Sequence, residues 1–262
     1  MAGIRNTIGD FPKKAMILAA GLSTRLGPLT DDRPKCMMLL GGKPLLEYTV
    51  EWLRDFGVTH IIINLCYLPE TIRSYFEDGR TWGVQITYSQ EEKPLGTAGG
   101  VKKVAWFFDG PFFVWYGDNL SHCDLDRLHR LHVVEGGLAT VALHHRDDPS
   151  SQSGIVGLDA NGRIVRFLEK PGRDQVFSNW VNAGIFVLEP EVLDFIPEEG
   201  CPDFGKDVFP TMLAAGQPLY GYLLSPEEGL WWIDTPEDLQ RVQKRIAEEG
   251  GNVRVAFRPR AR

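Results

Sequence analysis

Short apolar runs alternate with longer segments of helical period through the first 150 residues of this chain. The apolar runs predict strands at residues 15–20, 58–65, 84–89, 112–116 and 138–143. Between them lie a predicted helix that opens at Pro44 and closes at Gly57, and others at 69–77, 98–108 and 125–134. This order predicts an α/β fold with a Rossmann-like, mixed and mostly parallel sheet flanked by helices.

The pattern changes after about residue 150. Residues 154–159 and 163–170 predict a β-hairpin around Asn161-Gly162, because an Asn-Gly pair adopts the positive φ angles of tight hairpin turns. A strand at 181–188 and helices at 207–215 and 236–249 follow, which indicates a smaller α+β part. No Gly-, Ser- or Pro-rich linker separates the parts. We therefore expect a single domain over 1–262, with a first half at 13–150, a second at 151–248 and a basic tail at 249–262.

Composition excludes several classes of protein. The chain has 28 basic and 35 acidic residues, a net charge of −7, which argues against nucleic-acid binding. Its apolar stretches are far shorter than the roughly 20 residues that span a bilayer, so no membrane partner is expected. Four cysteines, none in a C-x-x-C pair, favour buried, reduced thiols. Without a secretory signal pattern at the N-terminus, these features predict a cytoplasmic protein.

A glycine-containing loop follows the first predicted strand. It reads LAAGLSTRLGPLTDDRPKC and contains Gly21, Gly27 and two cations, Arg25 and Lys35. At the carboxyl end of an α/β strand, such a loop lets backbone N–H groups approach a phosphate. The dinucleotide pattern G-x-G-x-x-G does not fit, which argues against hydride transfer. The loop predicts a phosphate site of another kind.

A second glycine pattern misleads. Gly200, Gly205 and Lys206 have the P-loop spacing, but Asp207 stands where Ser or Thr would hold magnesium. No clear strand precedes the segment. We reject a P-loop here.

Seven motifs follow one another along about residues 13–245: LAAGLSTRLGPLTDDRPK, GGKPLLEYTVEWL, SQEEKPLGTAGGV, YGDNL, FLEKP, NAGIFVLEP and IDTPEDL. In this order they resemble the motifs of the sugar-1-phosphate nucleotidyltransferases. The resemblance implies transfer of a nucleotidyl group from a nucleoside triphosphate to a sugar 1-phosphate, with release of pyrophosphate. It also implies Mg²⁺ as cofactor and leaves a homo-oligomer open.

The resemblance implies four catalytic residues. Arg25 would grip the triphosphate, and Lys35 would place a positive charge near the α-phosphate. Asp118 matches the first magnesium carboxylate of the family, and Lys170 matches a lysine that binds the sugar phosphate. We expect Arg25, Lys35 and Lys170 to gather into a cationic pocket.

A second metal carboxylate is less simply assigned. Much of the family has an Asp where this chain has Trp232, and Asp234 follows two residues later. Side chains two apart in a strand share a face, so Asp234 can join Asp118 as a metal ligand. Asp234 also fits as the cap of the helix that starts at Pro236. Both interpretations stay open.

The remaining site residues are likewise implied by the resemblance. The expected nucleotide-binding residues are Ala20, Gly21, Ser23, Thr24, Arg25, Gln90, Gly96 and Thr97. The expected substrate-binding residues are Gly154, Glu169, Lys170 and Asn182. For Trp231 and Trp232 we expect packing under the final helix rather than stacking on a ligand.

The choice of substrates is the last expectation. The motifs SQEEKPLGTAG and NAGIFVLEP are most similar to mannose-1-phosphate guanylyltransferases, which ranks GTP and mannose 1-phosphate first. Glucose-1-phosphate thymidylyl, uridylyl or cytidylyl transfer is the alternative within the family. A non-catalytic regulator that binds nucleotide sugars is the rival from another class.

Overall fold

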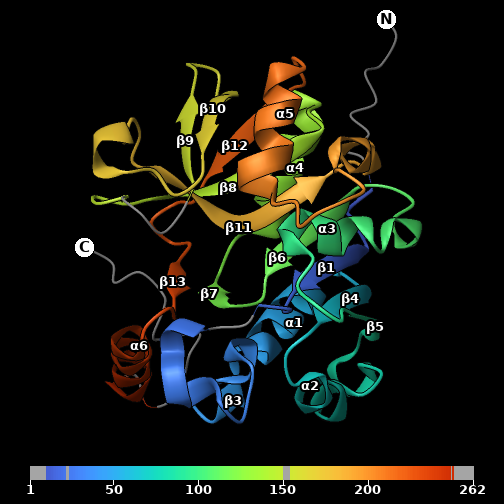
Figure 1. The fold of residues 1–262 in the computed structure, drawn as a ribbon, viewed down its shortest axis with the longest axis vertical. Helices are drawn as coiled ribbons and strands as arrows, with labels where there is room; N and C mark the ends of the chain where they lie inside the picture. Colours follow the sequence, from blue (N-terminus) through green and yellow to red (C-terminus); the bar gives the residue numbers. More distant parts are fainter. Residues whose placement is uncertain (1–9, 22–23, 150–153, 249, 251–262) are drawn as a thin grey trace, which may run out of the picture.

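The computed structural model describes residues 10–21, 24–149, 154–248 and 250. Within them, nine strands form one mixed sheet with the main order β10-β9-β11-β6-β1-β4-β5, while β8 pairs with β11 and β12 pairs with β8 (Figure 1). These strands are β1 (Lys14–Leu18), β4 (His60–Leu65), β5 (Gln85–Gln90), β6 (Phe112–Tyr116), β8 (Ala139–His145), β9 (Ile155–Leu158), β10 (Ile164–Leu168), β11 (Trp180–Leu188) and β12 (Leu219–Leu223). The α-helices are α1 (Leu45–Asp55), α2 (Pro69–Phe76), α3 (Gly96–Lys102), α4 (Leu125–Glu135), α5 (Phe209–Ala214) and α6 (Pro236–Glu248).

The direction of the strands changes within the sheet. Strands β6, β1, β4 and β5 are parallel, so their carboxyl ends meet at one edge. Strand β11 runs antiparallel to both β6 and β8. The predicted α/β fold with a mixed sheet flanked by helices is confirmed.

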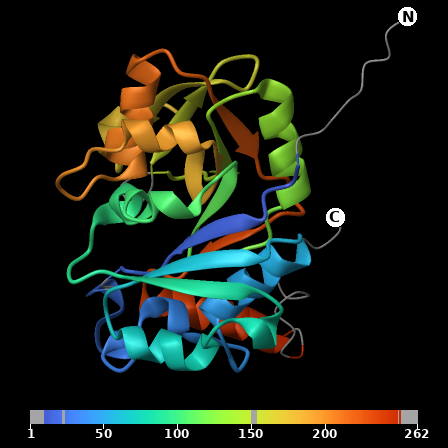
Figure 2. The ribbon, with the colours of Figure 1, turned by 90° about the vertical axis from the view of Figure 1, so that its right-hand side faces the viewer.

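Helices cover both faces of the parallel strands. Because side chains alternate along a strand, Ile17 faces a core that includes α1 and α2, whereas Met16 faces a core that includes α3 and α5. Figure 2 shows α1 and α2 on one side of β1, β4 and β5 and α3 on the other. The short apolar runs of the sequence are thus strands buried on both faces.

A third apolar cluster joins residues 38–48 to the C-terminal helix α6. Helix α6 packs beside the small pair β2 (Leu39–Leu40) and β3 (Lys43–Pro44), as Figure 1 also shows. The buried members of this cluster are Met38, Leu40, Leu45, Leu120, Ile233, Leu239, Val242 and Ile246. Trp231 packs against them, which confirms the packing expected for this tryptophan.

Three predicted helices differ from the structure. Pro44 belongs to β3, and α1 begins one residue later. Helix α3 ends at Lys102, and only a 3-10 turn (Ala105–Phe107) follows, because Phe108 leaves the helix to stack on Phe112 with ring centroids 3.7 Å apart.

The third difference is the helix expected at 207–215. A π-helical turn (Phe204–Val208) precedes α5, and the Asp203 side chain starts that turn by accepting from the backbone N–H groups of Gly205 and Lys206. These two N–H groups belong to the rejected P-loop pattern. Because both donate to the Asp203 carboxylate, they do not face a phosphate site.

All four cysteines are free; Cys36 and Cys123 are buried, Cys66 is half-buried and Cys201 is exposed. The expectation of buried thiols therefore holds for two of them. Over the described ranges, every helix is too short or too polar to cross a membrane.

The buried imidazole of His132 makes stability depend on pH. Its Nδ1 lies 2.9 Å from Thr140 Oγ1 and its Nε2 lies 3.2 Å from Glu189 Oε1. Burial, with the nearby His129, lowers the pKa of His132 from 6.5 to about 4. The unfolded chain therefore binds more protons between these values, and stability present above pH 6.5 is lost as pH falls toward 4.

We expect His132→Gln to flatten this dependence. In the wild type, the free energy of unfolding should fall by up to about 3 kcal/mol over that window because of this group. Denaturant unfolding at a series of pH values measures it. His60→Gln, at an exposed histidine, should keep the wild-type slope. A wild-type slope in His132→Gln would contradict the prediction.

Candidate active site

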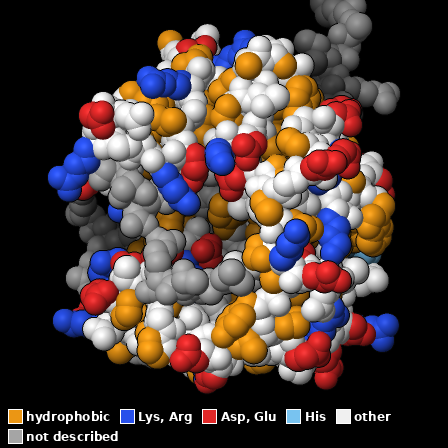
Figure 3. Space-filling model, viewed as in Figure 1, with side chains coloured by type: hydrophobic (Ala, Val, Ile, Leu, Met, Phe, Trp, Pro, Cys, Tyr) orange, Lys and Arg blue, Asp and Glu red, His pale blue; other side chains and the backbone are white. Residues whose placement is uncertain are grey.

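Two adjoining cavities lie at the carboxyl edge of the parallel strands. The larger has a volume of about 440 Å³ and lies where β1, β4, β5 and β6 end; the smaller has a volume of about 250 Å³. Figure 3 shows a hollow near the middle of this face with charged side chains around it. The residues that line both cavities are Thr97, Tyr116, Asp118 and Asp234. The two spaces therefore share one wall.

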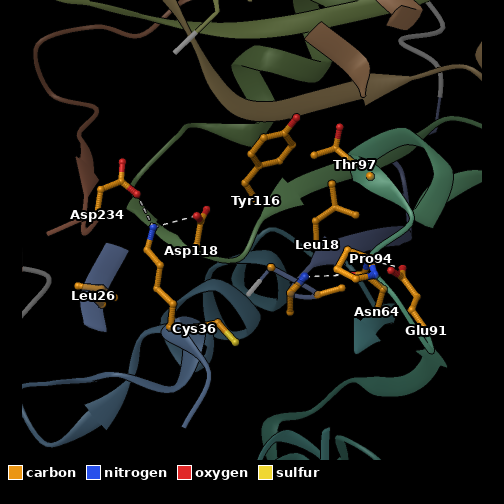
Figure 4. A pocket seen from close by; sticks show the side chains of 15 residues that line it. Leu18, Leu26, Cys36, Asn64, Glu91, Pro94, Thr97, Tyr116, Asp118 and Asp234 are labelled. Carbon is orange, nitrogen blue, oxygen red and sulfur yellow. Dashed lines mark hydrogen bonds and ion pairs between the residues drawn. The ribbon is translucent and has the colours of Figure 1, made fainter. Parts of the chain in front are cut away.

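Lys35 lines the larger cavity, and its ammonium contacts two residues of this shared wall. Its Nζ donates to Asp118 Oδ2 and to Asp234 Oδ1, both at 2.8 Å (Figure 4). The residue is only 5% exposed. Burial alone would lower the pKa of Lys35, but the two carboxylates outweigh burial and raise it above 10.5. At neutral pH the site therefore contains a buried, protonated ammonium paired with two carboxylates.

Local structure brings the two carboxylates together. Asp118 follows β6 through Gly117, where an added Cβ would lie 2.9 Å from Ile17 Cγ2 and 3.1 Å from the carbonyl oxygen of Leu18, so any larger residue would displace a neighbour in β1. Asp234 follows β13 (Leu230–Trp232), which pairs with β7 (Asn119–Ser121). Trp232 pairs with Asn119, so Asp234, which follows β13, lies near Asp118, which precedes β7.

The cap of α6 is Thr235. Its Oγ1 accepts from the backbone N–H of Asp238, and the Asp238 carboxylate accepts from the backbone N–H of Thr235, each at 3.1 Å. This reciprocal pair is a capping box. Since Thr235 fills the capping position, the alternative that assigned the cap to Asp234 does not hold. The Asp234 carboxylate instead faces Lys35.

The first loop lies on the larger cavity as expected. Ala20 and Gly21 line it, and a Cβ added at Gly21 would meet no atom within 4 Å. Thr24 and Arg25 begin the 3-10 turn Thr24–Thr30 that follows. Ser23 lies outside the described residues.

Sequence reasoning missed a buried polar network that positions the loop after β5, residues 91–95. Asn64 Oδ1 accepts from the backbone N–H of Ala19 at 2.7 Å, and Asn64 Nδ2 donates to Glu91 Oε1 at 2.8 Å. Glu91 Oε2 accepts from the backbone N–H of Leu95 at 3.0 Å. The network links the ends of β1, β4 and β5. Its signal in the sequence is a lone Asn within the apolar run of residues 61–65.

Gln90, expected to contact the nucleotide, lines neither cavity. It is exposed, and its Oε1 accepts from Arg73 Nη2 at 3.0 Å. The reason is the alternation of side chains at the end of β5, which directs neighbours to opposite sides. Glu91 lines the larger cavity in its place, together with Gly96 and Thr97.

All four predicted substrate residues line the smaller cavity: Gly154, Glu169, Lys170 and Asn182. Burial, together with the nearby Asp203, raises the pKa of Glu169 from 4.5 to about 7, and Lys170 opposes this shift. Lys170 has a φ of 48°, a strained angle for a residue with a side chain, and such strain is concentrated at functional sites.

Sequence reasoning missed five residues of the smaller cavity: Tyr116, Asn119, Gly184, Asp203 and Trp232. Asn119 is 5% exposed, and its Oδ1 has no hydrogen-bond partner in the described part of the chain. The Trp232 ring lies 4.9 Å from the Arg146 guanidinium. Because neighbours in a strand point to opposite sides, Trp231 packs under α6 while Trp232 lines the cavity, so the packing expected for Trp232 does not hold.

Charge in the two cavities is mostly negative. Their described lining has five carboxyl groups, those of Glu91, Asp118, Glu169, Asp203 and Asp234, against the two ammonium groups of Lys35 and Lys170. Of the three cations expected to gather here, Lys35 lines the larger cavity and Lys170 the smaller, whereas the side chain of Arg25 lies outside what the structure describes. Among the described residues, no three His, Cys, Asp or Glu side chains converge as a metal site.

Comparison with known proteins identifies the family. The model of a family described as nucleotidyl transferase matches residues 14–249, a range that includes both cavities. The chain belongs to this family.

Similar nucleotidyl transferases include proteins named for different substrates. One, from Synechocystis, is named UTP–glucose-1-phosphate uridylyltransferase; it is 39% identical over 92% of this chain and 66% of its own length. Another, from Oryza sativa, is named probable mannose-1-phosphate guanylyltransferase 1; it is 38% identical over 86% of this chain and 62% of its own length. The chain thus spans slightly less than two thirds of these relatives.

A solved structure of a nucleotidyl transferase shows the same fold. It is described as a putative glucose-1-phosphate thymidylyltransferase from Bacillus anthracis in complex with a sucrose. It is 25% identical, matches with a TM-score of 0.79, and covers 88% of this chain and 94% of its own.

Local unfolding distinguishes the roles of Thr235 and Asp234. We expect Thr235→Ala to lower the free energy of unfolding by about 1 kcal/mol and to speed amide exchange in the first turn of α6, because the cap is lost. Asp234→Ala should leave exchange in that turn unchanged relative to the rest of the helix. Hydrogen exchange read by mass spectrometry measures both. Equal fraying in the two variants would show that Asp234 also caps the helix.

Proposed function

We propose that this chain transfers a nucleotidyl group from a nucleoside triphosphate to a sugar 1-phosphate, most favourably from GTP to mannose 1-phosphate. An oxygen of the sugar phosphate attacks the α-phosphorus, the bond from that phosphorus to the oxygen bridging to the β-phosphate breaks, and pyrophosphate leaves. The products are a nucleotide sugar and pyrophosphate. The larger cavity would bind the nucleotide and the smaller the sugar phosphate.

The observation that carries this proposal is the place of Lys35. Its ammonium lies where the two cavities meet, so it is near both the incoming phosphate and the α-phosphate if each cavity takes its substrate. Transfer of this kind depends on positioning and on neutralising charge, because two polyanions must approach in line. A buried cation does this most strongly, since little water screens it.

The other side chains have complementary roles. Arg25 would grip the triphosphate with its forked guanidinium. Lys170 would bind the sugar phosphate, and Glu169 would accept hydrogen bonds from sugar hydroxyls. The Asn182 side chain is held in place by the backbone two residues later, because its Oδ1 accepts from the N–H of Gly184 at 2.9 Å. Its amide group therefore stays at the cavity wall.

Asp118 and Asp234 would hold Mg²⁺, which supplies the positive charge that the triphosphate needs. The donor set fits this ion, because Mg²⁺ in phosphate-transfer sites takes one or two carboxylates and completes its shell with phosphate and water oxygens. Both carboxylates already direct an oxygen at one cation, the Lys35 ammonium. The surplus of carboxyl groups in the cavities also favours a divalent cation alongside the triphosphate.

Glu91 favours some bases over others. Its carboxylate lines the larger cavity, only accepts hydrogen bonds, and uses one bond on each oxygen, so acceptor capacity remains. Guanine presents two donors side by side on its pairing edge, and uracil and thymine present a ring N–H, whereas adenine and cytosine present an amine beside an acceptor nitrogen that repels a carboxylate oxygen. This chemistry favours GTP, UTP or dTTP over ATP and CTP.

UTP with glucose 1-phosphate is the second candidate pair. It is favoured by the name of the relative from Synechocystis, which is 39% identical to this chain. GTP ranks first because the motifs around residues 89–99 and 182–190 resemble those of guanylyltransferases.

Pyrophosphate release tests the reaction. Five nucleoside triphosphates, each with mannose 1-phosphate or glucose 1-phosphate and Mg²⁺, should give the fastest turnover with GTP and mannose 1-phosphate and the slowest with ATP and CTP. Arg25→Ala should lower the rate by about 10²- to 10³-fold, as loss of one charge-stabilising group does. Arg80→Ala, at an exposed arginine paired with Asp78, should keep the wild-type rate.

Two outcomes would contradict the proposal. Full activity of Arg25→Ala would remove its assigned role. Tight binding of a nucleotide sugar with no turnover of any pair would favour the non-catalytic regulator.

Thermal unfolding tests the magnesium site without turnover. Lys35→Met leaves two carboxylates facing each other without their cation, so Mg²⁺ should stabilise this variant more than the wild type, raising its Tm by an additional 2–4 °C or about 1 kcal/mol. Lys102→Met, at a half-buried lysine paired with Glu198 outside both cavities, is the control. The same Mg²⁺ response in the two variants would argue against a metal site at Asp118 and Asp234.

A further inference from the structure

Asp203 lines the smaller cavity and binds a residue that lines both cavities. Its Oδ2 accepts from the hydroxyl of Thr97 at 2.7 Å, and Thr97 is one of the residues that line both spaces. Its Oδ1 accepts from the backbone N–H groups of Gly205 at 2.8 Å and Lys206 at 3.1 Å. One carboxylate thus joins the loop of the larger cavity to the wall of the smaller.

The contact is part of a junction between residues 201–206 and the start of α3. The first N–H groups of a helix have no partner inside it. Here the carbonyl of Pro202 accepts from Ala98 at 3.0 Å and from Gly99 at 3.3 Å. Gly96 has a φ of 79°, and an added Cβ there would lie 2.6 Å from the carbonyl oxygen of Cys201. Residues 201–206 therefore set where α3 begins.

At its other end, the junction confines Glu169. A Cβ added at Gly205 or at Gly154 would lie 2.5 Å from Glu169 Oε2, so this carboxylate fits between two glycines. Because the Gly205 N–H donates to Asp203 Oδ1, a shift of Asp203 would move one wall of the space that Glu169 occupies. Thr97, Asp203, Gly205 and Glu169 form a continuous path from one cavity to the other.

We propose that the Thr97–Asp203 hydrogen bond is a positioning contact that couples the two cavities, so that a nucleotide bound in one raises the affinity for a sugar 1-phosphate in the other. The proposal rests on the proposed function. A nucleotide that orders residues 94–97 fixes the Thr97 hydroxyl, which through Asp203 and Gly205 fixes the pocket of Glu169. The sugar phosphate then binds to an ordered cavity, and the same factor applies in reverse.

Binding of one ligand in the presence of the other measures this coupling. The probe is the α,β-methylene analogue of the nucleotide that turns over fastest, titrated by calorimetry with and without its sugar 1-phosphate. We expect the sugar phosphate to tighten binding about 10-fold in the wild type, within the usual range of coupling between sites. Thr97→Val should reduce this factor to about 1–2 and raise KM for the sugar phosphate more than it changes kcat.

Matched variants separate coupling from general damage. Thr97→Ser keeps the hydroxyl and should keep the factor. Thr211→Val also removes a threonine hydrogen bond, to the carbonyl of Asp207 at 2.7 Å in the adjoining helix, but lies outside both cavities and should behave as the wild type. Asp203→Asn keeps an oxygen for Gly205 and Lys206 but meets the Thr97 hydroxyl with an amide N–H, which replaces the charge-assisted hydrogen bond by a weaker one of reversed direction, and should lose most of the coupling. The double variant with Thr97→Val should lose no more.

The outcomes distinguish this inference from the proposed function. A chain that turns over a pair but shows no coupling, or retains it fully in Thr97→Val, overturns the inference alone. Equal loss in Thr97→Ser and Thr97→Val also overturns it, because the hydroxyl would then be irrelevant. A chain that neither binds nor turns over any pair overturns both proposals. A coupling factor that is retained in Thr97→Ser and Thr211→Val but lost in Thr97→Val and Asp203→Asn supports the inference.

Discussion

A buried ammonium is the constraint on which the site depends. An unpaired charge in a protein interior is very costly, so Lys35 needs its two carboxylates, which come from residues 83 and 199 positions away in the chain. To bring them there, β6 must turn at Gly117, β7 must pair with β13, and α6 must pack against residues 38–45. The apolar cluster under α6 therefore supports the charges as much as it supports the fold.

Much of the fold could be predicted because the local spacing of apolar residues indicates most of its strands and helices. Runs such as residues 112–115 are apolar throughout, as expected of strands covered on both faces. Strands β7 and β13 could not be found in this way, since each has three residues and forms only through pairing across more than a hundred positions. The end of the helix predicted at 98–108 was missed because stacking of Phe108 on Phe112, a tertiary contact, decides it.

The site residues could be predicted where a short motif specifies the residue. They could be predicted less well where the backbone geometry decides which of two neighbouring side chains faces the cavity. Glu169, Lys170 and Asn182 were each found from short motifs and do line one cavity. Gln90 and Glu91 differ by a single position, yet the pleat of β5 sends one out to Arg73 and the other into the cavity. The cap at Thr235 had a local signal, a threonine three residues before Asp238, and the structure shows both halves of that capping box.

The second cavity exists because the sheet changes direction between β6 and β11. In antiparallel strands, the amino end of one lies beside the carboxyl end of the other, so Asn182 near the start of β11 comes close to Tyr116 at the end of β6. A shift in register after Asn182, together with Gly184 at a φ of 72°, makes room for the Tyr116 ring, which a Cβ there would strike. Parallel strands alone would offer one cavity at their carboxyl edge. The reversal adds an adjoining one, and two substrates that must meet need both.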